Sequence, residues 1–189
     1  MAHSMGVIPA VDQLRHDDER SDAELVRATR AGDMTALAEL YRRFARMLMA
    51  VAYRLLASRE AAEDVLHDVF VGLPEALRKY DERGRLEAWL KQVTARMALS
   101  ALRHERTTAD LDVEVAQPRG SDPDEALTLE SALAALSPNL RAVLVLKEIE
   151  GFTHAEIAAM LGISKGASEV RLHRALAALR AALVKGGRP

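Results

Sequence analysis

The chain of 189 residues contains no cysteine, so disulfides, thiolate metal sites and thiol redox switches are excluded. None of its six histidines pairs with another at the three- or four-residue spacing of metal ligands on a helix. Aromatic residues make up only 4% of the chain, whereas apolar residues make up 49% and Ala, Leu and Arg dominate. Such a composition favours helices over sheets, so we expect an all-α protein without metal or cofactor.

Membrane signals and a strong net charge are also missing. No apolar run approaches the length of a membrane span, and the start lacks a signal-peptide pattern, so we expect a cytoplasmic protein with no membrane insertion. On the hypothesis that residues 1–5 are an expression remnant, we leave them out of the fold reasoning. The formal net charge is −2, which gives no global basic field. Binding to nucleic acid would therefore have to be local or aided by a partner.

The hydrophobic pattern divides the chain into two small helical domains. Residues 1–20 are polar and predicted to be disordered, and residues 21–106 show four helical segments. Residues 107–123 are acidic and interrupted by proline and glycine, which indicates a flexible linker and not a third domain; from the residues alone, a plain tether is the favoured interpretation. Residues 124–185 contain about four further helices.

Two local features refine this expectation. Pro74 lies late in the third helical segment, where it should kink or restart the helix. Ser137 is expected to cap a helix in the second domain, with Pro138 in its first turn.

The segment from Thr153 to Leu183 has the pattern of a helix-turn-helix. Thr153 and Glu156 form a capping box, Gly162 stands where a left-handed residue ends a helix, and Ser164 can cap the next one. From Thr153 to the C-terminus six Lys or Arg residues face two Glu, a local excess that suits phosphate contact. An ordinary helix pair with solvated charges is the alternative. The outward positions of the second helix are Glu169, Val170, His173 and Arg174, flanked by Lys165 and Arg171.

With these features the chain resembles the bacterial RNA polymerase sigma factors of the extracytoplasmic-function (ECF) group. The stretch LSPNLRAVLVLKEIEGFTHAEIAAMLGIS, from Leu136 to Ser164, is similar to the region 4 signature of that family. The stretches AAEDVLHDVFVGL and YDERGRLEAWLKQV are similar to region 2. The resemblance implies a non-enzymatic subunit that binds core RNA polymerase and promoter DNA, takes no small-molecule substrate and is held by an anti-sigma factor.

The resemblance also implies roles for particular residues. The acidic residues Glu63, Asp64 and Asp68 would bind the polymerase largest subunit. In the second helix of the helix-turn-helix, Lys165, Glu169, Val170, Arg171, His173 and Arg174 would bind the minus-35 element. The loop from Tyr80 to Arg85 would capture a flipped base of the minus-10 element. The residues expected to contact that element are Tyr80, Arg83, Arg85, Lys91, Arg96, Ser100 and Arg103.

Some positions depart from the common pattern of the family. Glu169 stands where a basic residue is frequent, and Ser168 where Val is frequent. An acid in the DNA groove weakens non-specific affinity. The base contacts implied by the resemblance then need not hold at this position, and a different promoter preference is the alternative. Two other functions fit parts of the sequence. A sigma-like decoy would titrate an anti-sigma factor, and its action would be insensitive to Arg174→Ala. An autonomous helix-turn-helix repressor would bind two-fold sites without polymerase.

Overall fold

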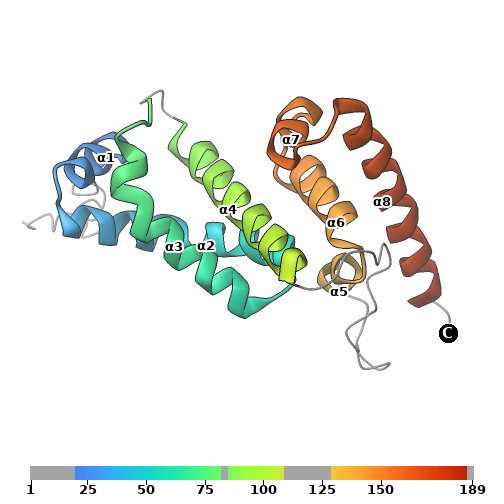
Figure 1. Cartoon of the computed structure of the whole chain (residues 1–189). Helices are drawn as coiled ribbons and strands as arrows, with labels where there is room; N and C mark the ends of the chain where they lie inside the picture. Colours follow the sequence, from blue (N-terminus) through green and yellow to red (C-terminus); the bar gives the residue numbers. More distant parts are fainter. Residues whose placement is uncertain (1–19, 82–84, 109–128, 187–189) are drawn as a thin grey trace, which may run out of the picture.

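The computed structural model describes residues 20–81, 85–108 and 129–186, which are helical and contain no strand. They form two units that lie side by side (Figure 1). The N-terminal unit contains α1 (Asp22–Arg30), α2 (Met34–Leu56), α3 (Arg59–Leu77) and α4 (Leu86–Thr108). The C-terminal unit contains α5 (Leu129–Ala134), α6 (Pro138–Leu144), the π-helix η2 (Val145–Ile149), α7 (His154–Leu161) and α8 (Lys165–Gly186). The all-α, two-unit architecture expected from composition and periodicity is confirmed.

Three long helices form the core of the N-terminal unit, because α2, α3 and α4 each pack on the other two. Their apolar side chains recur every three or four residues and are buried on the shared face. Leu40, Leu48 and Leu55 of α2 are fully buried, as is Leu90 of α4. α4 continues to Thr108, past the boundary near residue 106 that we expected from the sequence. The predicted disordered start and most of the predicted linker lie outside the described residues.

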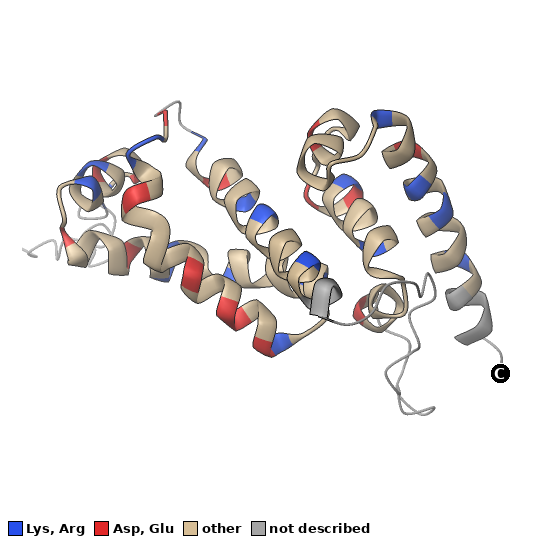
Figure 2. Ribbon diagram, in the orientation of Figure 1, with Lys and Arg blue, Asp and Glu red and all other residues tan. Residues whose placement is uncertain are grey.

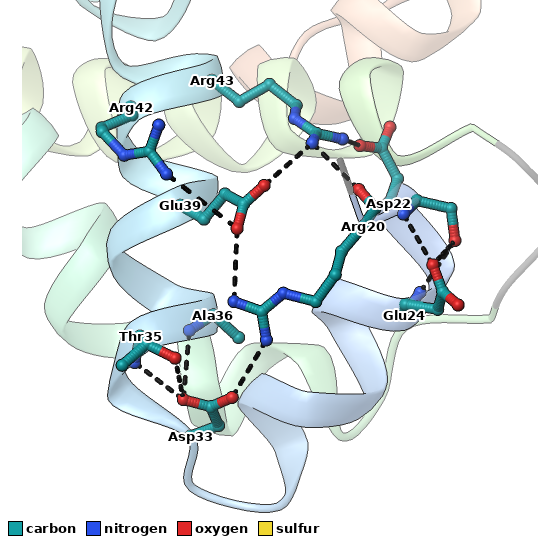
Figure 3. A network of polar contacts seen from close by, with 10 residues as sticks. Arg20, Asp22, Glu24, Asp33, Thr35, Ala36, Glu39, Arg42 and Arg43 are labelled. Atoms are coloured by element: carbon teal, nitrogen blue, oxygen red, sulfur yellow. Dashed lines mark hydrogen bonds and ion pairs between the residues drawn. The ribbon is translucent and has the colours of Figure 1, made fainter. Parts of the chain in front are cut away.

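A polar network fastens α1 to α2 (Figure 3). Arg20 spans Asp33 and Glu39 with nitrogen–oxygen distances of 3.1 and 3.2 Å. Arg43 joins Glu39 at 3.2 Å to Asp22 in the first turn of α1 at 2.5 Å. The network alternates in charge, and every member lies at the surface or is only partly buried. It therefore orients α1 on α2 more than it stabilises the fold.

Asp33 begins α2 as its N-cap. Its Oδ1 accepts hydrogen bonds from the Thr35 hydroxyl and from the backbone N–H groups of Thr35 and Ala36. These donors, led by the Thr35 hydroxyl, hold the pKa of Asp33 at about 2, below the ordinary 3.8. The capping carboxylate is therefore ionised at neutral pH.

Two local expectations were wrong in detail. Of the kink or restart expected at Pro74, the restart was wrong: α3 continues through Pro74 as a single helix, because only three residues follow and both Leu73 and Leu77 are anchored in the core. Ser137 does occupy the N-cap of α6, but its side chain makes no capping hydrogen bond. Pro138 at the first helical position already fixes the backbone for helix entry.

In the C-terminal unit, α6 widens into η2, which the sequence did not predict. The Glu150 N–H bonds to the Val145 carbonyl at 3.0 Å, an i to i−5 bond. Gly151, at φ +78°, then turns the chain toward α7. α8 packs against α5, α6 and α7, so this one long helix closes the unit.

Candidate nucleic-acid interface

The helix-turn-helix is formed by α7 and α8, as predicted. Thr153 and Glu156 make both bonds of the capping box, and the Thr153 hydroxyl lowers the pKa of the Glu156 carboxyl. Gly162 ends α7 at φ +67°, a backbone conformation that a side chain would strain. The Ser164 hydroxyl accepts from the Ala167 N–H at 3.1 Å and caps α8. Local sequence alone therefore fixes the turn between the two helices.

One face of α8 points to solvent over its first three turns. Val170 is 53% exposed although it is apolar, and Arg171 alone among the predicted contacts is only partly exposed. The opposite face is buried, with Ser168 and Ala175 fully inaccessible. Figure 2 shows basic residues repeating along this helix. All six residues predicted to meet the minus-35 element lie on these turns: Lys165, Glu169, Val170, Arg171, His173 and Arg174.

Glu169 has a partner on its own helix. Its Oε1 lies 3.7 Å from Lys165 Nζ, and the two side chains are 51% and 69% exposed. An exposed i, i+4 pair of this kind contributes only about 0.3–0.5 kcal/mol, so both groups remain available for other partners.

A polar contact between α7 and α8 was not predicted. His154 Nδ1 lies 2.9 Å from the hydroxyl of Ser168, which is fully buried. A buried hydroxyl requires a hydrogen-bond partner, and His154 supplies it across the two helices. The signal in the sequence was a serine on the otherwise apolar face of α8.

A second basic surface lies on α4. Arg96, Ser100 and Arg103 are spaced by four and three residues and therefore share one side of the helix. Arg96 and Arg103 are exposed and Ser100 is partly exposed. Lys91 lies five residues before Arg96, about 140° around the helix, so it belongs to a different face. The structure brings three of the predicted minus-10 residues together and separates Lys91 from them.

The loop before α4 is anchored by aromatic side chains. Tyr80 is 7% exposed, and its ring centroid lies 4.9 Å from that of Trp89. Arg30 of α1 donates hydrogen bonds to the carbonyls of Leu77, at 2.8 Å, and Tyr80. Tyr80 thus forms the base of the loop and does not project from it, whereas Arg85 is exposed.

Arg83, also predicted to contact the minus-10 element, lies outside the described residues.

An acidic surface covers the outer side of α3 (Figure 2). Glu63, Asp64 and Asp68 are all exposed, and an ion pair of 2.8 Å joins Glu63 to Arg59 on the same helix. The N-terminal unit therefore presents an acidic side on α3 and a basic side on α4. Binding by these surfaces would be electrostatic and screened by salt.

No group of three or more His, Asp or Glu side chains in the described ranges could hold a metal ion. Among the same residues, no helix is long and apolar enough to cross a bilayer.

Two known protein families match the chain, one over each unit. The sigma-70 region 2 family matches residues 40–108, and the sigma-70 region 4 family matches residues 126–179. The first match covers most of the N-terminal unit, and the second contains α7 and most of α8.

Individual relatives are similar to this chain in sequence along most of its length. The ECF RNA polymerase sigma factor SigM of Mycobacterium tuberculosis is 33% identical over 183 residues, which cover 95% of this chain and 92% of that protein. The RNA polymerase sigma factor CarQ of Myxococcus xanthus is 33% identical over 158 residues, with coverages of 80% and 91%. The solved structure of CnrH in complex with the cytosolic domain of CnrY superposes with a TM-score of 0.53 at 26% identity, covering 87% of this chain and 97% of CnrH. The chain belongs to the ECF RNA polymerase sigma factor family and is an alternative sigma factor that initiates transcription.

Proposed function

We propose that this sigma factor uses three separate surfaces, one for each partner. The face of α8 reads the minus-35 element, the face of α4 contacts the minus-10 element, and the acidic face of α3 binds core polymerase. The single observation that carries the proposal is the segregation of charge onto three exposed helix faces of the appropriate sign (Figure 2).

The minus-35 assignment rests on groove geometry. B-DNA's major groove admits one α-helix, and the exposed first turns of α8 present side chains suited to base edges. Arg174 can pair with guanine in a bidentate manner, and Glu169 can accept from cytosine N4. Lys165 and Arg171 contact phosphates and set the register. His154, through Ser168, fixes α8 against α7 and so positions this face.

The minus-10 assignment rests on α4 and the loop before it. Arg96, Ser100 and Arg103 contact the backbone of the melted strand, while Arg85, which is exposed, acts from the loop together with Arg83. The buried ring of Tyr80 contributes by supporting the loop through Trp89.

Lys91 faces away from the Arg96 surface. Its Nζ lies 3.0 Å from Glu87 of the same helix and 3.8 Å from Glu150 of the C-terminal unit, so these carboxylates must release it before it contacts DNA.

The polymerase assignment rests on charge. Glu63, Asp64 and Asp68 form an exposed acidic row that fits a basic partner and would steer association. We assign residues 21–106 to the polymerase and minus-10 functions and residues 124–185 to the minus-35 function, joined by the acidic segment 107–123.

The protein acts by binding and not as an enzyme, and it works in the cytoplasm beside the polymerase. CnrH, which shares the fold, is held by the cytosolic domain of another protein, CnrY. By analogy, an anti-sigma factor regulates this chain. The exposed cations of α4 and α8 favour a promoter-binding protein over a sigma-like decoy.

Three variants test these surfaces separately. Arg174→Ala should weaken binding of the holoenzyme to promoters with an intact minus-35 element and have little effect on core binding. Arg96→Ala should impair opening of the minus-10 region, measured by permanganate reactivity of unpaired thymines. Asp64→Lys should lower affinity for core polymerase without changing the thermal unfolding midpoint. If all three variants lose the same activity to the same extent, the assignment of separate surfaces is wrong.

A further inference from the structure

Among the exposed large apolar side chains of the described ranges, Val170 alone lies on α8. It is 53% exposed, in a row whose other outward side chains, Glu169, His173 and Arg174, are polar. Single exposed valines are common on protein surfaces, so exposure alone indicates nothing. What distinguishes Val170 is its place on the helix that faces DNA.

Val170 points away from the body of the C-terminal unit. Each residue of an α-helix is turned by about 100° from the one before it, so Val170 lies about 160° around α8 from Ser168 and about 140° from Ala175. Both of these residues are fully buried. Ser168 is also held by His154, whose Nδ1 lies 2.9 Å from the serine hydroxyl, and this contact fixes the rotation of α8 about its axis. The outward direction of Val170 is therefore set by packing and a hydrogen bond on the far side of the helix.

The cations on either side of Val170 place it over the floor of the DNA groove. Lys165 and Arg171, which we assign to phosphates, lie about 140° and about 100° around the helix from Val170, in opposite directions. Phosphates line the two walls of the major groove, and base edges form its floor. When the two cations reach the walls, Val170 faces the base edges between them.

The surface beside Val170 lets a base edge approach closely. Side chains of an α-helix lean toward its N-terminus, so Val170 leans over the position one turn earlier, which is Gly166. No described atom lies within 4 Å of the point where a Cβ would stand at Gly166, so the space there is open. A β-branched side chain also has one strongly preferred rotamer in a helix, so a contact made by Val170 costs little side-chain entropy.

Thymine is the base that offers a partner for such a side chain. Its C5-methyl group is the apolar group that base edges present in the major groove. Placed against the cytosine amino group or against N7 and O6 of guanine, Val170 would displace water from a polar group without replacing the hydrogen bond. The side chain therefore favours thymine in two ways, through the methyl contact and through the penalty on the competing bases.

We propose that Val170 selects a thymine in the minus-35 element by packing against its C5-methyl group. Glu169 and Arg174, on either side of Val170 on the same face, supply the hydrogen bonds to other base positions. This inference rests on the proposed assignment of α8 to the minus-35 element, and it adds which chemical group of the DNA one side chain reads. An element made only of G·C pairs would contradict it.

Deoxyuridine isolates the proposed contact, because it lacks the C5-methyl group of thymine and otherwise presents the same base edge. The test uses a promoter fragment on which the holoenzyme starts transcription. Each thymine of its minus-35 element, on both strands, is replaced singly by deoxyuridine. At one of these thymines the replacement should weaken holoenzyme binding about fourfold, which is the effect of losing one buried methyl group. At that same thymine, the Val170→Ala holoenzyme should bind both fragments equally well.

Val71→Ala provides the matched control. Val71 of α3 is 66% exposed and lies on the other unit, so the same truncation there should leave the ratio between the thymine and deoxyuridine fragments unchanged. Val170→Ala should not lower the thermal unfolding midpoint, because the valine is exposed and alanine is the stronger helix former. Misfolding therefore does not mimic the expected result.

Two kinds of failure are distinguishable. If the wild-type holoenzyme is insensitive to deoxyuridine at every thymine of the element, or if Val170→Ala keeps the wild-type ratio, Val170 does not read a methyl group. The assignment of α8 survives that result as long as Arg174→Ala and base changes in the element still weaken binding. If scrambling the whole minus-35 element leaves holoenzyme binding unchanged, the assignment of α8 is itself wrong and the inference about Val170 fails with it.

Discussion

Replacing Glu169 with glutamine changes the charge of the α8 surface without changing its shape. The Lys165 ammonium does not cancel the Glu169 charge. The ion pair between Lys165 Nζ and Glu169 Oε1, at 3.7 Å, is more than half exposed and contributes at most about 0.5 kcal/mol. A carboxylate about 8 Å from a DNA phosphate costs ~0.5 kcal/mol in water. The variant should therefore bind any duplex DNA about twofold more tightly.

The same substitution should change base preference more strongly. A glutamate accepts from cytosine N4, whereas a glutamine pairs with adenine N6 and N7. The contacted position should shift from cytosine toward adenine by about 1–3 kcal/mol, which is five- to more than a hundredfold. Holoenzyme binding to promoter fragments varied base by base through the minus-35 element would measure both effects.

A matched control is available on α3. Glu75 has comparable exposure and a similar surface pair, with Arg78, but lies far from α8 in the sequence and on the other unit. Glu75→Gln should change neither general affinity nor base preference. If Glu169→Gln leaves every minus-35 preference unchanged, Glu169 does not face the bases.

Three further outcomes are expected. Glu63→Lys combined with Asp68→Lys should weaken core polymerase binding about tenfold in a titration at low salt, with the loss shrinking at high salt; a salt-independent loss would contradict an electrostatic contact. Arg103→Ala should slow promoter opening on duplex templates more than on templates with a premelted minus-10 region, and equal slowing on both would argue against a role in melting. Asp33→Ala should lower the thermal unfolding midpoint at pH 7. Because the folded pKa of Asp33 is about 2 and its ordinary value 3.8, its stabilising effect is complete above about pH 4. The difference from wild type should diminish as the pH falls from 4 to 2, and a difference that persists at pH 2 would contradict the capping role.

Local chemistry predicted most of the helices. Thr153 and Ser164 were each expected to begin a helix, and each caps one in the structure. Gly162 ended α7 as expected because a left-handed residue was needed there. Signals of this kind depend on a few neighbouring residues, so they can be read without knowledge of the fold.

Contacts between distant residues could not be predicted in the same way. Arg141 and Glu150 resemble ordinary helix-surface charges in the sequence, yet both side chains are buried against the other unit. Periodicity assigns a residue to a helix face but does not say which element covers that face. The widening of α6 into η2, which carries Glu150 to the interface, has no known local signal.

For the candidate surfaces too, the sequence predicted what depends on helical spacing and missed what depends on contacts between distant residues. The acidic side of α3 and the outward face of α8 followed from helical spacing and are exposed. Tyr80 was expected at the DNA surface but is buried against Trp89, because the ring packs where α3 ends and α4 begins. Sequence alone could not distinguish an exposed loop aromatic from one that anchors the loop.

In vitro transcription tests the central claim most directly. Core RNA polymerase is incubated with genomic promoter fragments, with and without the full chain, and the transcript 5′ ends are mapped. The account predicts discrete new start sites whose upstream sequences share minus-35 and minus-10 elements, and loss of those starts with Arg174→Ala. Failure to direct core polymerase to any specific start site, on any native promoter, would contradict it.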